Sequence, residues 1–201
     1  MSVALVKQGG EDDAPAPTGT LWLARHAQPL VESGVCYGQL DIPADAQATA
    51  TSARALAVAL PPGIRIVCSP LQRCELLTQT LCGLRADLTY KLDSRLMEMN
   101  FGNWEGRRWS GIGQPAIDAW VADFTHHRPG GGESVSALLR RVAGIWEEAR
   151  AGERTLWITH AGVIRAATLL HAGQRHIDRA DQWPLTAPEF GGWTVLNLPS
   201  R

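Results

Sequence analysis

The 201-residue sequence lacks any long apolar run. Its apolar stretches are far shorter than the roughly 18 residues that a membrane-spanning helix needs. The first twenty residues hold no long apolar segment behind a basic start, so they do not resemble a secretory signal peptide. They are rich in Gly, Pro, Asp and Glu, and we expect a flexible leader over residues 1–19. Together these features indicate a soluble, cytoplasmic protein.

The sequence also has little net charge and very few lysines. Its formal charge is −1 at pH 7, and its 19 basic residues comprise 17 Arg and two Lys. A balanced charge gives no general attraction for nucleic acid or an anionic membrane. Genomic base composition explains most of the Arg bias, although a few Arg side chains can still grip an anion.

Cysteine and metal motifs are sparse. The four Cys form no Cys-x-x-Cys pair, and three of them lie in apolar segments, which indicates buried reduced thiols. No Asp-rich motif occurs. His126 and His127 are adjacent, so on a helix they would not face the same way, and we expect a surface pair in a loop. We therefore expect no metal and no other cofactor.

Predicted strands and helices alternate along the chain. The predicted strands lie at residues 20–25, 64–69, 155–160 and 193–198, with a weaker one within 86–93. The predicted helices lie within residues 44–63, 70–83, 109–124, 131–152 and 161–173. This order predicts an α/β fold, a three-layer sandwich with a mostly parallel central sheet flanked by helices. With no internal repeat or linker, residues 20–201 are expected to form one domain.

Basic and imidazole side chains follow three of the predicted strands. Arg25 and His26 come where the first strand ends, and Arg73 lies in the helix after the second. His160 stands at the turn after another strand. Because parallel strands end at one edge, where open α/β sheets bind ligands, these groups and two helix N-termini should converge. That combination describes a phosphate site.

Each residue alone has a simpler explanation. A single His at a strand end is more often a hydrogen-bonded structural residue, and Arg73 alone reads as a helix surface residue. The joint pattern after three strands is hard to explain by packing.

Four spaced motifs resemble those of the histidine phosphatase superfamily, also called phosphoglycerate-mutase-like. The resemblance covers about residues 20–170, in the family's order, and it implies the family's fold. A Gly-Gly-Glu-Ser stretch before a long helix is also typical. The motifs are Arg25-His26-Ala27, Ser69 to Arg73, Glu98 ahead of Phe-Gly-Asn-Trp-Glu-Gly, and His160-Ala161-Gly162.

The resemblance implies phosphoryl transfer through a phosphohistidine on His26. Neighbouring Arg side chains should depress the pKa of this imidazole, because like charge disfavours the cation, and so keep the nucleophile neutral near pH 7. Arg25 and Arg73 would hold the non-bridging oxygens with their planar forks. His160, expected to be protonated beside the phosphate, would add another donor.

The resemblance assigns the general acid to Glu98. It would protonate the leaving alkoxide and then take a proton from the water that attacks the phosphohistidine. Glu105 lies in the same loop and is a rival, but we expect it to anchor the loop. The Arg and His cations would take the place of a magnesium ion.

Several positions depart from the family pattern. Ala27 replaces the usual Gly and Gln28 a common Glu, changes that should affect specificity. Family mutases carry Trp-Asn where this chain has Val31 and Glu32, and an Arg after the catalytic Glu where it has Met99. These differences argue against a mutase.

A short stretch, Cys-Tyr-Gly-x-x-Asp, resembles the corresponding loop of α-ribazole phosphatases. We therefore expect a phosphomonoesterase acting on α-ribazole 5′-phosphate or on another small phosphorylated metabolite, as a monomer or homodimer. A mutase and a non-catalytic phospho-ligand binding module are the alternatives. No motif assigns residues 171–192, which could line or cap the pocket. The expected substrate-binding residues are Arg25, Arg73, His160, Gln28, Cys36, Tyr37, Gly38 and Ala161.

Overall fold

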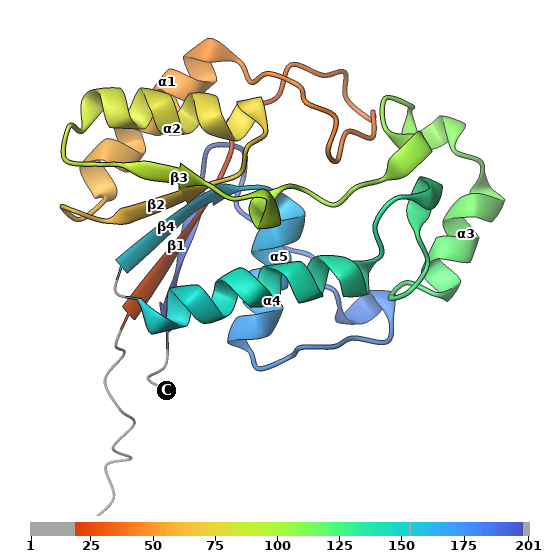
Figure 1. The fold of residues 1–201 in the computed structure, drawn as a ribbon. Coiled ribbons are helices and arrows are strands. Elements are labelled where there is room, and N and C mark those ends of the chain that lie inside the picture. Colours follow the sequence, from red (N-terminus) through yellow and green to blue (C-terminus); the bar gives the residue numbers. More distant parts are fainter. Residues whose placement is uncertain (1–18, 153, 199–201) are drawn as a thin grey trace, which may run out of the picture.

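A five-stranded sheet organises residues 19–152 and 154–198, the parts of the chain that this computed structural model describes (Figure 1). The strand order is β3-β2-β4-β1-β5. Neighbours are parallel except β5, which runs antiparallel to β1 at one edge. The predicted leader lies outside the described residues apart from Gly19, which begins β1. The strands are β1 (Gly19–Arg25), β2 (Arg65–Cys68), β3 (Tyr90–Leu92), β4 (Arg154–Thr159) and β5 (Trp193–Leu198).

Helices cover both faces of the sheet, as Figure 1 shows. Helices α1 and α2 pack on one face, α4 and α5 pack on the other, and α3 lies away from the sheet. The predicted three-layer α/β architecture is therefore confirmed. None of the helices in the described ranges is long and apolar enough to cross a bilayer. The helices are α1 (Ala46–Ala59), α2 (Gln72–Leu84), α3 (Gln114–Ala122), α4 (Val135–Ala151) and α5 (Ala161–His171).

The central strands are apolar on both sides because each side meets a helix layer. In β1, Leu23 joins the cluster beneath α4 and α5, whereas Ala24 joins the cluster beneath α1 and α2. In β4, Trp157 and Ile158 divide in the same way. Successive strand residues point to opposite faces, so a doubly covered strand reads as a continuous apolar run.

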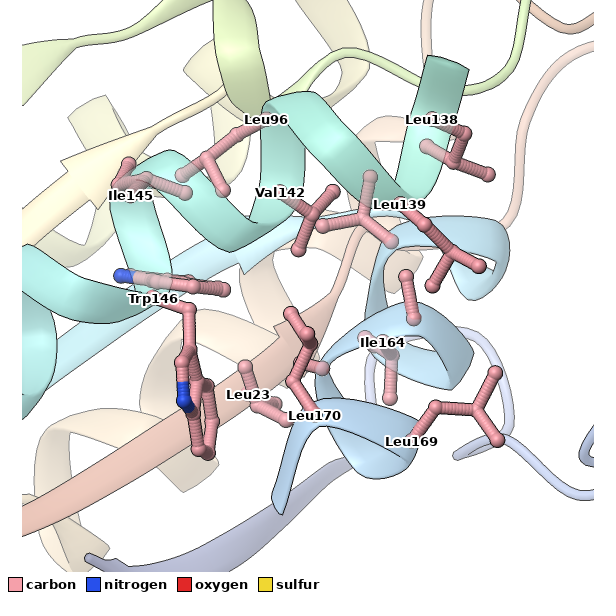
Figure 2. Packing of buried hydrophobic residues seen from close by; sticks show 14 of the residues in the cluster. Leu23, Leu96, Leu138, Leu139, Val142, Ile145, Trp146, Ile164, Leu169 and Leu170 are labelled. Carbon is pink, nitrogen blue, oxygen red and sulfur yellow. The ribbon is translucent and has the colours of Figure 1, made fainter. Parts of the chain in front are cut away.

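Helix α4 illustrates how periodicity places the core. Val142 and Trp146 are four residues apart on its buried face and lie over Leu23 and Leu170 in Figure 2. The helix begins after Ser134, whose hydroxyl oxygen accepts a hydrogen bond from the amide of Ala137 at 3.3 Å, and it ends at Ala151, before a glycine.

One predicted helix is shorter than expected. The pattern predicts a helix over residues 109–124, but the chain forms a single 3₁₀ turn at Trp109–Gly111 and α3 begins only at Gln114. Gly113 has φ of 57°, which a right-handed helix cannot accommodate, so it separates the two.

Candidate active site

The ends of three strands meet at one edge of the sheet. The amide of His26 donates to the Thr159 carbonyl at 3.0 Å, and the amide of Ser69 donates to the Ile158 carbonyl at 3.0 Å. Strands β1 and β2 therefore flank β4, and the residues that follow β1 and β2 lie on either side of His160. The ring centroids of His26 and His160 are 5.1 Å apart. The expected convergence of strand ends is confirmed.

His26 is held in one tautomer by the backbone of the next residue. Its Nδ1 lies 2.7 Å from the Ala27 carbonyl oxygen, which can only accept, so Nδ1 carries the proton and Nε2 keeps its lone pair. Burial lowers the pKa of His26 to about 3, and the charges of Arg73 and Arg25 act in the same direction. The imidazole is therefore a neutral base with one free nitrogen, which is what a nucleophile requires.

Arg73 is fully buried rather than on the helix surface. Its guanidinium donates to the carbonyls of Leu40 and Gly38, at 3.0 and 2.7 Å, so the loop before α1 orients it. No carboxylate lies within ion-pair distance of it in the described part of the chain. A buried cation without a counter-charge is costly, and this one indicates an anionic ligand.

Arg25 is fixed by a segment that no motif identified. Its guanidinium donates to the Pro188 carbonyl at 3.1 Å and its central carbon lies 3.8 Å from the centroid of the Phe190 ring. The same ring contacts His26, with centroids 5.5 Å apart. Phe190 therefore contacts both Arg25 and His26. The sequence carried no motif in residues 171–192 that could have identified Phe190 as part of the site.

His160 is fully buried against α2. Its Nε2 lies 2.8 Å from the Ser69 hydroxyl oxygen and 3.4 Å from the Cys74 sulfur. Burial, and then the charge of Arg73, hold the pKa of His160 well below its usual value. The expected protonation of His160 applies to the site with phosphate bound, and it stays a prediction.

Glu98 is positioned by two backbone amides. Its carboxylate accepts from the amide of Met99 at 2.9 Å and from the amide of Gly162, in the first turn of α5, at 3.1 Å. A Cβ on residue 162 would come within 2.2 Å of Glu98 Oε1. Glycine at this position is therefore what lets the carboxylate approach the helix.

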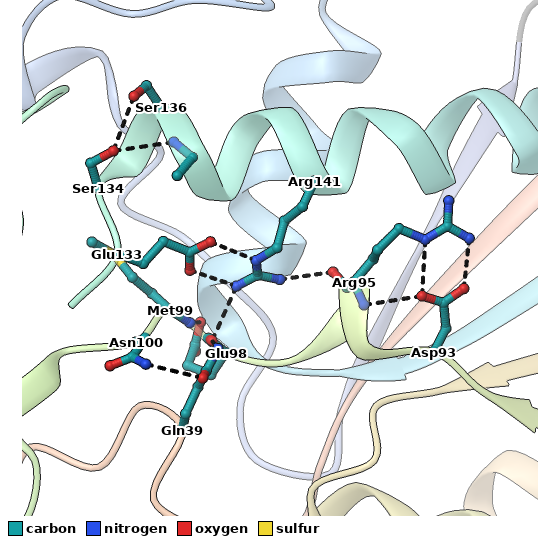
Figure 3. A network of polar contacts seen from close by, with 11 residues as sticks. Gln39, Asp93, Arg95, Glu98, Met99, Asn100, Glu133, Ser134, Ser136 and Arg141 are labelled. Carbon is teal, nitrogen blue, oxygen red and sulfur yellow. Dashed lines mark hydrogen bonds and ion pairs between the residues drawn. The ribbon is translucent and has the colours of Figure 1, made fainter.

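A polar network fixes the backbone of Glu98 (Figure 3). Its carbonyl accepts from Gln39 at 3.0 Å and from Arg141 at 3.1 Å. Arg141 is oriented by a two-bond pair with Glu133, at 2.7 and 2.8 Å. Glu133, in the Gly-Gly-Glu-Ser stretch, thus orients Arg141, which in turn holds the Glu98 carbonyl.

Glu105 anchors the loops around the site. Its carboxylate accepts from the amides of Gln39 and Phe101, each at 2.9 Å, and also from that of Leu40. These bonds leave Glu105 tied to the backbone, and they confirm the expectation that it holds the loop in place.

A cavity of about 100 Å³ opens over these groups. Fully buried Arg73 and His160 do not line it, so their direct contact with a phosphate stays a prediction. Three of its lining residues, Val35, Phe101 and Trp109, were not predicted to bind substrate, although Phe101 begins the Phe-Gly-Asn-Trp-Glu-Gly motif. The lining residues are Arg25, His26, Val35, Cys36, Tyr37, Gly38, Glu98, Phe101 and Trp109.

The predicted substrate-binding residues divide into two groups. Cys36, Tyr37 and Gly38 line the cavity. Gln28 and Ala161 do not: Gln28 is exposed, with its side-chain amide 3.5 Å from the next residue's carbonyl, and Ala161 is buried as the first residue of α5. Direct binding by these two is therefore not supported by their positions.

Two members of the Cys-Tyr-Gly loop have clear physical roles. A Cβ on Gly38 would lie 2.0 Å from the Met99 carbonyl oxygen, so only glycine allows this loop to pack against the segment that follows Glu98. Burial raises the pKa of the Cys36 thiol to about 12, so it stays protonated and is a poor nucleophile.

No group of three or more His, Cys, Asp or Glu side chains arranged to hold a metal ion occurs within residues 19–152 and 154–198. His126 and His127 lie in a loop, as expected, but His127 is half-buried, and the ring of His126 contacts that of His176.

Solved structures share this fold over most of the chain. TTHB049 from Thermus thermophilus is 29% identical, with a TM-score of 0.68 over 90% of this chain and 95% of that one. A mycobacterial glucosyl-3-phosphoglycerate phosphatase in complex with VO3 is 25% identical, with a TM-score of 0.75 over 88% and 90%. A protein described as mycobacterial hydrolase 2 is 25% identical, with a TM-score of 0.74 over 88% and 81%.

A search of curated protein sequences finds no match for this chain. The family model of the histidine phosphatase superfamily, branch 1, matches residues 21–198. That range contains every residue of the site described above, and the similar structures include a phosphatase. The chain therefore belongs to branch 1 of the histidine phosphatase superfamily and is a phosphatase enzyme.

Proposed function

We propose that this phosphatase hydrolyses small phosphomonoesters through a phosphohistidine on Nε2 of His26. The hydrogen bond from His26 Nδ1 to the Ala27 carbonyl carries this proposal, because it leaves Nε2 unprotonated. The guanidinium groups of Arg25 and Arg73 lie near it, and neither has a carboxylate partner among the described residues. A neutral nucleophile between cations suits attack on a phosphate dianion, whose charge would otherwise repel it.

In the first half-reaction, Nε2 attacks phosphorus as the ester P–O bond breaks. Arg25 and Arg73 hold the non-bridging oxygens, and His160, oriented by Ser69, supplies an N–H donor. Glu98, in its protonated form, gives its proton to the leaving alkoxide.

In the second half-reaction, Glu98 takes a proton from water as the water oxygen attacks the phosphohistidine. The N–P bond breaks, its electron pair returns to Nε2, and inorganic phosphate leaves. Glu98 ends protonated and His26 neutral, so the cycle closes without a net change in the protein.

The proposal is tested by replacing the nucleophile. His26→Ala should abolish turnover of 4-nitrophenyl phosphate while leaving the far-UV circular dichroism spectrum intact. Wild-type enzyme mixed with labelled substrate and quenched should retain acid-labile, base-stable label, and its activity should resist EDTA. Full turnover by His26→Ala would overturn the mechanism.

For the substrate, we propose α-ribazole 5′-phosphate. Support comes from the Cys36-Tyr37-Gly38 loop, which lines the catalytic cavity. Asp41 of the same stretch accepts from the amide of Gln72 at 2.8 Å and so ties the loop to the start of α2. Another small phosphorylated metabolite is the second candidate, since a similar structure belongs to a glucosyl-3-phosphoglycerate phosphatase.

A substrate panel separates these candidates. The panel contains α-ribazole 5′-phosphate, glucosyl-3-phosphoglycerate, and 3-phosphoglycerate with and without a bisphosphate primer. We expect the highest kcat/KM with α-ribazole 5′-phosphate. A higher kcat/KM with glucosyl-3-phosphoglycerate would identify a sugar phosphate as the preferred substrate. Primed transfer between isomers without release of phosphate would identify a mutase.

A further inference from the structure

A second cavity adjoins the catalytic one. It has a volume of about 260 Å³ and shares Glu98 and Phe101 with the catalytic cavity. We call it the aromatic cavity. Its walls come from α3, α4, α5 and the segments around them. The lining residues are Glu98, Met99, Phe101, Trp120, Phe124, Val135, Leu138, Gly162, Arg165 and Trp183.

Aromatic rings form a continuous wall of this cavity. The Phe101 and Trp120 centroids are 5.9 Å apart in a T-shaped contact, and the Trp120 and Phe124 rings stack with centroids 5.6 Å apart. The Phe124 and Trp183 centroids are 6.2 Å apart. Such walls favour a flat apolar ring through burial and stacking. A sugar would leave several hydroxyl groups without partners there, since Glu98 and Arg165 are the lining residues with charged side chains.

The position of Glu98 connects the aromatic cavity to the reaction. Its carboxylate is held by the amides of Met99 and Gly162, and both of these residues also line the aromatic cavity. A general acid must lie within hydrogen-bond reach of the leaving oxygen. The group attached to that oxygen therefore lies next to Glu98, where the aromatic cavity opens.

Arg165 adds a polar feature to the otherwise apolar wall. One of its terminal nitrogens donates to the Leu185 carbonyl at 3.2 Å, whereas its buried Nε has no partner among the described residues. Across that same part of the chain, no carboxylate lies within 4.0 Å of its guanidinium nitrogens. A half-buried cation with unused donors favours a ligand that brings an acceptor.

We propose that the aromatic cavity is the leaving-group subsite, and that it takes a planar aromatic or heteroaromatic group carrying a hydrogen-bond acceptor for Arg165. This inference rests on the proposed function, because it places the leaving group by the acid Glu98. It defines a class of phosphomonoesters whose leaving group carries an aromatic or heteroaromatic ring, either directly on the leaving oxygen or, as in a benzimidazole nucleotide, beyond a ribose.

The first test compares two substrates in two variants of neighbouring residues. Trp120→Ala should lower the ratio of kcat/KM for 2-naphthyl phosphate to kcat/KM for glycerol 2-phosphate about tenfold, the size of one lost aromatic stacking contact. Val121→Ala, at an exposed position on the same helix, should leave this ratio unchanged. An equal loss for both substrates, or no loss, would overturn the subsite.

A second variant keeps the test independent of α3 packing. Arg165→Met should raise KM for 4-carboxyphenyl phosphate more than KM for phenyl phosphate, because only the first offers an acceptor beyond the ring. Arg54→Met, an exposed arginine on α1, is the control. Equal effects on the two aryl phosphates would show that Arg165 does not contact the leaving group.

Binding of 2-naphthol distinguishes failure of the subsite from failure of the proposed mechanism. Calorimetric titration of His26→Ala with 2-naphthol requires no turnover. We expect binding that Trp120→Ala weakens about tenfold in the same background. If the variant binds 2-naphthol but the wild-type enzyme forms no phosphohistidine, the mechanism is wrong and the subsite stands. If the wild type forms a phosphohistidine but the variant does not bind 2-naphthol, the subsite is wrong and the mechanism stands.

Discussion

At the scale of single residues, the chemistry of His26 is set by its immediate surroundings. One carbonyl fixes the tautomer, and burial together with two guanidinium groups keeps the ring neutral. The sequence predicted the position of Arg25, which directly precedes His26. It did not predict the burial of Arg73, because helix periodicity alone does not show that a charged side chain faces the site. His160 shows the same gap, since its motif does not reveal that the ring is fully buried.

The low pKa of His26 predicts how stability depends on pH. With a folded-state pKa of about 3 and an unfolded value near 6.5, the unfolded chain binds the proton first as pH falls. The contribution of His26 to the free energy of unfolding is therefore complete above pH 6.5 and is lost between about 6.5 and 3, by roughly 1.4 kcal/mol per pH unit at most.

Urea unfolding from pH 4 to 8 checks this dependence. His26→Ala should show a smaller fall in stability below pH 6.5 than the wild type, with His160 accounting for part of what remains. Identical profiles for the two proteins would show that His26 titrates normally in the folded state.

Gly162 offers a test of the general acid that leaves Glu98 itself in place. Gly162→Ala puts a methyl group where Oε1 of Glu98 lies and should displace the carboxylate. We expect kcat for an alkyl phosphate to fall about a hundredfold, the usual size of a general acid effect, and kcat for 4-nitrophenyl phosphate to fall much less. The nitrophenolate needs no proton to leave.

Gly83→Ala is the matched control, because no atom lies within 4 Å of the added methyl group on α2. Its kinetics should equal those of the wild type. If Gly162→Ala slows both substrates to the same degree, Glu98 does not act as the acid.

At the scale of elements, the segment before β5 completes the first motif. The amide of Arg25 donates to the Gly192 carbonyl and that of Gly191 donates to the His26 carbonyl, both at 3.0 Å. Phe190 then packs on both side chains. These contacts depend on the path that residues 171–192 take across the fold, which no local pattern encodes, so the sequence could not reveal them.

Phe190→Leu should therefore weaken phosphate binding. Loss of the cation–π contact with Arg25 should raise the inhibition constant of inorganic phosphate about fivefold and lower kcat/KM to a similar degree. Leu185→Ala, at an exposed side chain in the same segment, should change neither. An unaltered phosphate inhibition constant in Phe190→Leu would show that the ring does not position Arg25.

The pair formed by Arg141 and Glu133 links α4 to the acid-bearing loop. Both side chains are mostly buried, so Arg141→Met leaves Glu133 without its partner and removes a donor to the Glu98 carbonyl. We expect a loss of about 3 kcal/mol in the free energy of unfolding, measured by urea denaturation. Glu133→Gln/Arg141→Met should lose less than the sum of the two single variants, and strict additivity would contradict the pairing.

At the scale of the whole molecule, the sheet order explains why the motifs could be found in the sequence. Strands β2 and β1 flank β4, so motifs that are far apart along the chain end side by side. The apolar runs of these strands made the layers predictable, whereas Gly113 shortened α3 in a way that periodicity did not show. The aromatic cavity could not be predicted, since α3, α4 and α5 contribute only one or two residues each to it.

The location of the phosphoryl group on the protein tests the central claim most directly. Wild-type enzyme quenched in alkali during turnover is digested and analysed by mass spectrometry, and the phosphorylated nitrogen is identified by phosphorus–proton NMR. The account predicts phosphate on Nε2 of His26, because Nδ1 is bound to the Ala27 carbonyl. Phosphate on Nδ1, on another residue, or on no residue while turnover proceeds would contradict it.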